Sequence, residues 1–199
     1  MGIMAIKKKN KSELKVGLKS SLSKELVGFK KGDIYIILTK PESYHTVCQI
    51  LLKHLVETLK YNGLYITLNT PCNTIASQCR DLGLNASKLH FVDGISKKGG
   101  IKEVKANNCS YIESPSALTE LSITLTTATN TGKFDFLFLD SISTLLIYND
   151  IELTERFIHH IVSKLRNLEM CGVLIAIDEE KSRKLVDIVS QFCDKLIVA

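Results

Sequence analysis

Residues 133–141 read KFDFLFLDS, an apolar run that ends in an aspartate followed by a serine. The run is short and rich in Phe and Leu. It also lacks the polar–apolar alternation of a strand with one wet face, so it predicts a strand buried on both sides. Asp140 then stands at the carboxyl end of that strand, where parallel sheets place their ligands. A capping role for such an aspartate is the plain alternative.

The rest of the chain repeats this pattern from Asp33 onward. Short apolar segments alternate with segments whose apolar residues recur at the three-and-four spacing of helices. Alternation of this kind predicts a parallel sheet covered by helices on both faces, a three-layer α/β fold. The predicted strands are 34–39, 64–68, 89–92, 134–140, 172–178 and 195–199, and the predicted helices are 44–61, 72–82, 115–130, 151–169 and 179–193. The polar stretch 93–114 is predicted to be a long surface loop or an excursion from the fold.

The amino-acid composition argues against several classes of protein. The 199 residues are 45% hydrophobic and 24% charged, as in ordinary globular proteins, and the apolar runs are too short to span a membrane. Residues 1–31 contain no apolar core of the signal-peptide type, which predicts a cytoplasmic protein with no membrane partner. The six cysteines form no C-x-x-C pair, so the pattern favours reduced thiols over a zinc or disulfide framework.

The positive charge lies in the leading segment. Residues 1–31 hold nine lysines and two glutamates, a net charge of +7, which leaves −2 of the overall +5 for the remainder. Leucines at 14, 18, 22 and 26 fit a basic amphipathic helix, although Gly17 weakens it. We therefore divide the chain into a basic segment 1–25, either flexible or a docking helix, and a core 26–199. Three interpretations of the lysines stay open: a solvated tail, docking on a neighbouring subunit, or contact with nucleic-acid phosphates.

The segment TKPESYHT (39–46) follows the first predicted strand, where a phosphate-binding loop would stand. Set against the pattern GxxxxGK followed by Ser or Thr, Thr39 and Tyr44 replace the glycines, His45 replaces the lysine, and only Thr46 matches. Glu42 adds negative charge where phosphates would lie. The glycines of the pattern let amides wrap phosphate and its lysine neutralises charge, so this loop lacks both functions. Taken alone, the segment is better explained as an unrelated loop.

Taken together, these segments resemble a known family. Their order and spacing are similar to those of the RecA-superfamily ATPases of the KaiC-like and Rad-type recombinase group, many of them archaeal, over about residues 26–199. The segments that carry the resemblance are ELVGFKKGDIYIILT, GLYITLNTP, DLGLNASKLHFVDG, FDFLFLDSIS and MCGVLIAIDEE. The resemblance implies a RecA-like P-loop-NTPase fold. It also implies that strand 34–39 lies between strand 172–178 and the C-terminal strand, in a sheet of about five strands plus an edge strand.

The resemblance also assigns roles to residues. The family's phosphate-contacting lysine falls on His45 and its magnesium-binding hydroxyl on Thr46, in a degenerate Walker A loop. Its Walker B aspartate falls on Asp140, which Ser141 follows. The glutamate that activates the attacking water falls on Asn69, and an asparagine cannot act as a general base.

These losses imply a pseudo-ATPase, with a vestigial nucleotide site and neither ATP nor Mg²⁺ as an expected cofactor. Asp140 and Thr46 would then have structural roles, such as capping a helix. The partner implied is the chain itself or an intact RecA/KaiC-family ATPase. The alternatives are a recombination mediator that binds single-stranded DNA through the lysine-rich segment, and an ATP-binding protein with a non-standard phosphate loop. An enzyme of different chemistry, such as a methyltransferase, lacks the glycine-rich turn its cofactor needs.

Overall fold

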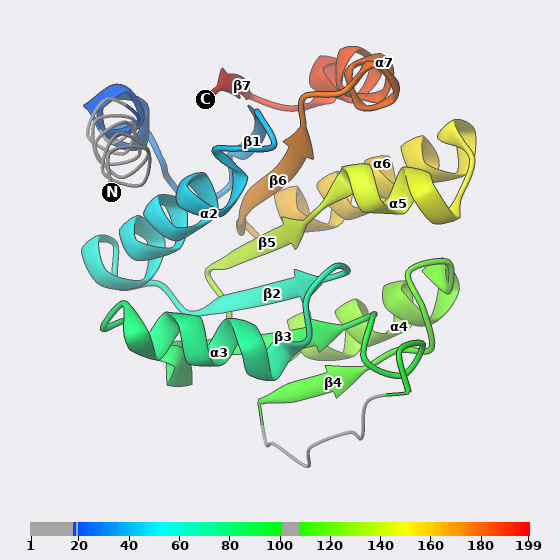
Figure 1. The fold of residues 1–199 in the computed structure, drawn as a ribbon, viewed down its shortest axis with the longest axis horizontal. Helices are drawn as coiled ribbons and strands as arrows, with labels where there is room; N and C mark the ends of the chain where they lie inside the picture. Colours follow the sequence, from blue (N-terminus) through cyan, green and yellow to red (C-terminus); the bar gives the residue numbers. More distant parts are fainter. Residues whose placement is uncertain (1–17, 19, 101–107) are drawn as a thin grey trace, which may run out of the picture.

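The fold is built on one seven-stranded parallel sheet. It was obtained as a computed structural model that describes residues 18, 20–100 and 108–199. The strands are β1 (Ile34–Thr39), β2 (Gly63–Thr67), β3 (Leu89–Asp93), β4 (Cys109–Tyr111), β5 (Phe136–Asp140), β6 (Cys171–Ile177) and β7 (Lys195–Val198). They lie in the order β4-β3-β2-β5-β6-β1-β7, and every pairing between neighbours is parallel (Figure 1).

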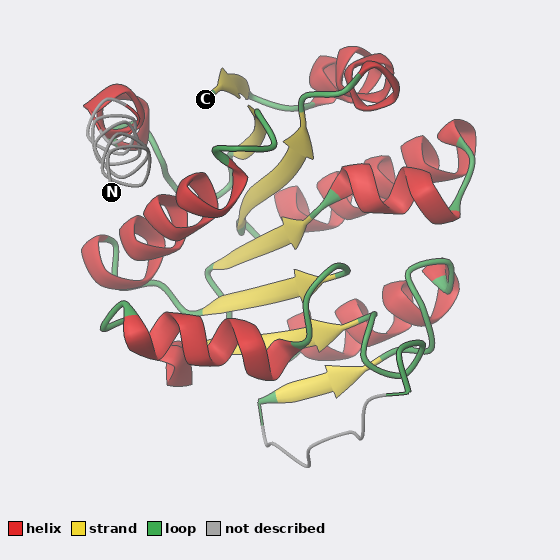
Figure 2. Cartoon of the chain, viewed as in Figure 1, coloured by secondary structure: helices red, strands yellow, loops and turns green. Residues whose placement is uncertain are grey.

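Helices cover both faces of the sheet (Figure 2). They are α2 (Tyr44–Lys53), α3 (Cys72–Asp81), α4 (Leu118–Thr129), α5 (Ile142–Tyr148), α6 (Ile151–Asn167) and α7 (Glu180–Val189). The predicted helix 44–61 is shorter than expected, because α2 gives way to a π-helical turn at His54–Thr58. Single 3₁₀ turns at Ala86–Lys88 and Ser190–Phe192 precede β3 and β7.

Alternate residues of each central strand enter two separate apolar cores. In β1, for example, Ile34 and Ile36 belong to the core that also contains residues of α4, α5, α6 and α7, whereas Tyr35 and Ile37 belong to the core that contains residues of α2 and α3. Both sets are buried, so an apolar residue is favoured at every position of such a strand. This explains why the strands show no alternation in the sequence, and the predicted three-layer α/β fold is confirmed.

The predicted position of β1 in the sheet is also confirmed. Ile34 pairs with Gly172 of β6 on one side, and Tyr35 pairs with Lys195 of β7 on the other. The strands named from the sequence agree with the structure to within two residues at each end. The prediction of a surface loop or excursion at 93–114 is wrong over Cys109–Tyr111, where β4 extends the sheet beyond β3. The CSY sequence of β4 is short, polar and half-buried, so it carries no strand pattern.

The described part of the N-terminal segment is helical over residues 20–26. Its Leu22 and Leu26 are only 1% and 5% exposed, and they lie in the core that also contains α2. An ion pair between Glu25 and Lys195 joins this segment to β7. Leu14 and most of the lysine-rich stretch lie outside the described residues, so the division into 1–25 and 26–199 stays a prediction.

None of the helices in the described part of the chain has both the length and the apolar content that crossing a bilayer requires.

Candidate functional site

The carboxyl ends of β1, β2 and β5 meet at one edge of the sheet. Asp140 is the last residue of β5 and lies opposite Thr67 of β2. The loop that follows β1 leads into α2 beside it, and Asn69 follows β2. Asp140 is only 5% exposed, so its carboxyl group needs partners within the protein. The structure thus brings together the loop, the Asn69 position and the Asp140 position that the sequence singled out.

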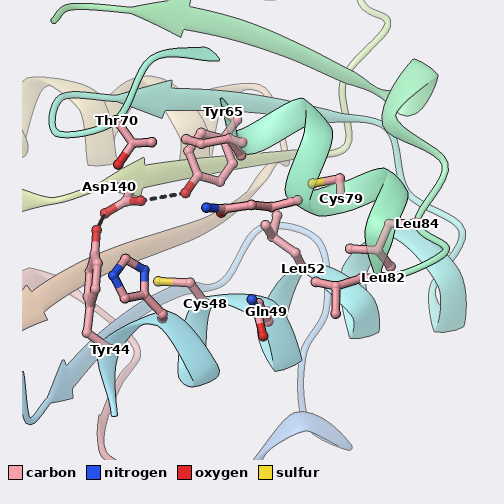
Figure 3. Close-up of a pocket in the computed structure, with 13 residues that line it drawn as sticks. Tyr44, Cys48, Gln49, Leu52, Tyr65, Thr70, Cys79, Leu82, Leu84 and Asp140 are labelled. Atoms are coloured by element: carbon pink, nitrogen blue, oxygen red, sulfur yellow. Dashed lines mark hydrogen bonds between the residues drawn. The ribbon is translucent and has the colours of Figure 1, made fainter. Parts of the chain in front are cut away.

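Two tyrosines supply those partners (Figure 3). The Tyr44 hydroxyl donates a hydrogen bond to Oδ1 of Asp140. The Tyr65 hydroxyl donates to Oδ2 at 2.5 Å. Tyr65 lies in β2 and is 2% exposed, and its ring stacks on Phe138 with the centroids 5.0 Å apart. Both oxygens of the Asp140 carboxyl group are therefore engaged by phenols that stand on two different elements.

Burial shifts the pKa values of this cluster. Removal from water raises the pKa of Asp140 above its ordinary value of 3.8, although the bonds from Tyr44 and Tyr65 oppose the shift. Burial and the nearby Asp140 charge raise the pKa of both tyrosines far above the physiological range. The two phenols consequently keep their protons and act as donors to Asp140.

This cluster predicts how stability depends on pH. Asp140 holds a proton more tightly when folded than when unfolded, so its contribution to stability is complete below pH 3.8 and is lost as the pH rises through the folded pKa. Asp140→Asn is nearly isosteric and does not titrate. We expect the stability of the wild type relative to this variant to fall from acid towards neutral pH. Urea unfolding at a series of pH values measures the difference, and a flat or rising difference would contradict the prediction.

The loop between β1 and α2 does not form a cradle for phosphate. The amides of Ser43 and Tyr44 both donate to the carbonyl oxygen of Lys40, at 3.0 Å each. Thr39 is fully buried, and no residue of the loop has the positive φ that a glycine would allow. A phosphate-binding loop needs such amides directed at the ligand, whereas here they close a turn on themselves.

The remaining loop residues lie around this turn. His45 is exposed, with its ring centroid 5.0 Å from that of Tyr44, and Glu42 is exposed as well. Thr46 is half-buried in the first turn of α2. The expectation that Thr46 acts as a helix cap is wrong, because Ser43 is the N-cap residue of α2 and makes no side-chain capping bond.

Ser141 and Asn69 belong to a second hydrogen-bonded group. Ser141 follows a cis peptide bond after Asp140, and its hydroxyl accepts from the amide of Thr144 at 3.3 Å, which caps α5. The Thr144 hydroxyl donates to Oδ1 of Asn69 at 2.5 Å. Asn69 in turn lies 3.5 Å from the Tyr44 hydroxyl through its amide nitrogen. The capping role considered for Asp140 therefore belongs to Ser141.

Sequence reasoning missed Tyr65 and Thr144. Tyr65 did carry a signal, because a tyrosine inside a fully buried strand needs a partner for its hydroxyl group. The missing step was the pairing of β2 with β5, which brings that hydroxyl to Asp140. Thr144 carried no such signal in the sequence, since a threonine one turn into a helix is common.

A small cavity adjoins Asp140 on the side of α2 and α3 (Figure 3). Its volume is about 40 Å³, enough for roughly three water molecules at about 10–15 Å³ each and far too small for a nucleotide. The cavity is lined mainly by Tyr44, His45, Cys48, Gln49, Tyr65, Thr70, Gln78, Cys79 and Asp140.

Comparisons with known proteins agree with this architecture. The family model for the KaiC ATPase matches residues 18–198. A solved structure of a KaiC-like protein from the hyperthermophilic archaeon Pyrococcus horikoshii is similar with a TM-score of 0.61 and 14% sequence identity, over 86% of this chain and 72% of that one. No curated protein matches the sequence. The family match covers nearly the whole chain and the structural match shows the same fold, so the protein belongs to the KaiC family of ATPases, within the RecA superfamily.

Proposed function

We propose that this chain is a KaiC-family protein that does not hydrolyse ATP and acts as a regulatory or scaffolding subunit through protein–protein contacts. The observation that supports this most is the engagement of both Asp140 oxygens by Tyr44 and Tyr65. In P-loop ATPases the Walker B aspartate must be ionised and directed at the hydrated magnesium ion. Here burial raises the pKa of Asp140, and Tyr44 extends to its carboxyl group from the loop that would hold the phosphates.

Two further features support the same conclusion. The exposed Asn69 stands where the resemblance expects the catalytic glutamate, and its amide cannot take a proton from water. The amides of Ser43 and Tyr44 are bonded to Lys40 and would have to break those bonds before they could contact a phosphate. Metal binding, phosphate binding and water activation are thus each weakened by a different residue.

The partner we propose is a second copy of this chain or an intact ATPase of the family. The edge strand β7 supports a protein contact, since Leu196 and Val198 are 41% and 69% exposed and no other strand of the described residues pairs with its outer side. An unpaired strand edge with apolar side chains is a ready template for a partner. The lysine-rich stretch on which nucleic-acid binding would depend lies mostly outside the described residues, and we propose no second function from it.

Calorimetric titration with ATP and Mg²⁺ tests the proposal, together with a phosphate-release assay. We expect no saturable heat at micromolar ATP and no phosphate release above the buffer rate. A catalytically intact KaiC-family ATPase provides the positive control under the same conditions. Micromolar binding with turnover would refute the proposal, and binding without turnover would support instead an ATP-binding protein with a non-standard phosphate loop. Native mass spectrometry, with and without that ATPase, then identifies the partner.

A further inference from the structure

Cys72 and Cys109 meet in space although 36 residues separate them along the chain. Cys72 is the first residue of α3, and Cys109 is the first residue of the edge strand β4. Their sulfur atoms lie 2.8 Å apart, with the Cys109 thiol donating to the Cys72 sulfur. Both are free thiols, and the pair lies outside the Asp140 cluster. The helix and the strand that carry the two residues follow different strands of the sheet, so the spacing of the cysteines in the sequence does not predict this contact.

The surroundings make the two sulfurs unequal. The Cys72 sulfur is approached by the Cys109 thiol and by the Tyr111 hydroxyl at 3.4 Å. The bond from Cys109, and then that from Tyr111, lower the pKa of Cys72, while the same bond and burial raise the pKa of Cys109. A thiolate is the reactive form of cysteine, so Cys72 is the better nucleophile and Cys109 the group that keeps its proton.

The neighbouring Asp93 raises the question of a metal site, because its carboxylate and the two sulfurs lie within 4.8 Å of one another. Its oxygens already accept four hydrogen bonds, from the amides of Cys72, Ile95 and Ser96 and from the Ser96 hydroxyl, at 2.7 to 2.9 Å. Asp93 therefore orders the start of α3 and the turn after β3. Two sulfurs alone fall short of the four ligands of a zinc site.

We propose that Cys72 and Cys109 form a redox-active dithiol that hydrogen peroxide converts to a disulfide. Cys72 is 3% exposed and Cys109 is half-buried, so the oxidant must be small. The Cys72 sulfur attacks one peroxide oxygen, the O–O bond breaks, and the departing hydroxide leaves as water with the Cys72 proton. The Cys109 sulfur then attacks the sulfenic acid on Cys72, the S–O bond breaks, and the second water carries away the Cys109 proton.

The product would join the first turn of α3 to the edge strand β4. The same loop that leads into α3 carries Asn69, whose side chain bonds Thr144 next to the Asp140 cluster. Oxidation would thus restrain the segment between β2 and α3 in relation to β4. The proposal rests on the geometry of the two thiols and is independent of whether the chain binds ATP.

The experiment treats the folded full-length protein with hydrogen peroxide, blocks the remaining thiols with a maleimide after denaturation, and measures intact mass and non-reduced peptides. We expect four modified cysteines instead of the six free thiols of the reduced protein, and a cross-linked peptide containing Cys72 and Cys109, both reversed by dithiothreitol. Recovery of all six thiols, of a different linked pair, or of sulfinic acid on Cys72 without a cross-link would overturn the proposal.

Single-residue variants test whether Cys72 and Cys109 are the two cysteines that form the cross-link. Cys72→Ser and Cys109→Ser should each abolish the cross-link. The matched control is Cys193→Ser, because Cys193 is also half-buried and burial raises its pKa to about 12, which makes its thiol unreactive. That control should form the Cys72–Cys109 cross-link as the wild type does. Because the wild-type result stands without any variant, a variant that fails to fold leaves the proposal testable.

Discussion

Replacement of Tyr65 by alanine should destabilise the protein by about 3 to 5 kcal/mol, the range for loss of a large buried aromatic side chain. The ring is 2% exposed, stacks on Phe138 and packs against Phe91, so its removal leaves a cavity between the sheet and α2. Asp140 would in addition keep only the Tyr44 hydroxyl as a phenolic partner. Chemical unfolding monitored by circular dichroism measures the loss.

Tyr65→Phe separates the ring from its hydroxyl group. This variant keeps the stacking and loses one donor to a buried carboxyl group, for which we expect a cost of about 1 to 3 kcal/mol. The alanine variant should therefore be clearly less stable than the phenylalanine variant. If Tyr65→Phe is as stable as the wild type, the Tyr65–Asp140 bond contributes nothing, and the two-tyrosine arrangement loses its energetic basis.

The fold was predictable because its signals are local and repeated. Each buried strand is an apolar run, each helix has an apolar face, and right-handed crossovers leave few ways to arrange them. Two of the features that escaped prediction lack such signals. The strand β4 has three residues at the margin of the sheet, and the π-helical turn His54–Thr58 continues the apolar face of α2 without any break in the pattern.

The sequence predicted which residues of the family's nucleotide site are missing, but not which side chains contact one another in their place. The missing glycines, lysine and glutamate could be identified because each has a fixed position in the motifs of the family. It did not show that Tyr44 bonds Asp140, since the partner lies 96 residues away and depends on how β1 and β5 align across β6. The contact of Cys72 with Cys109 has the same origin, because it depends on the position of β4 beside β3. The order of the strands in the sheet determines which strand ends meet. The contacts between their side chains are seen only in the structure.

Gly63→Ala should also destabilise the protein, with a cost of about 1 to 3 kcal/mol for overpacking a close-packed core. Gly63 begins β2 directly opposite Phe136 of β5, and the end of the Phe136 ring covers it. A methyl group there would lie 2.0 Å from Cζ of that fully buried ring, so the ring or the strand must move. Since β2 and β5 carry Asn69 and Asp140 at their far ends, a shift between them would also disturb the site.

Two comparisons test this explanation by chemical unfolding. Gly28→Ala should be nearly neutral, because Gly28 is exposed and a methyl group there would meet its nearest atom at an ordinary 3.6 Å. Phe136→Leu should recover part of the loss when combined with Gly63→Ala, because leucine ends well short of the Cζ position that causes the clash. The double variant should then be more stable than the sum of the two single effects. Strict additivity would show that backbone freedom at Gly63, and not the ring above it, accounts for the glycine.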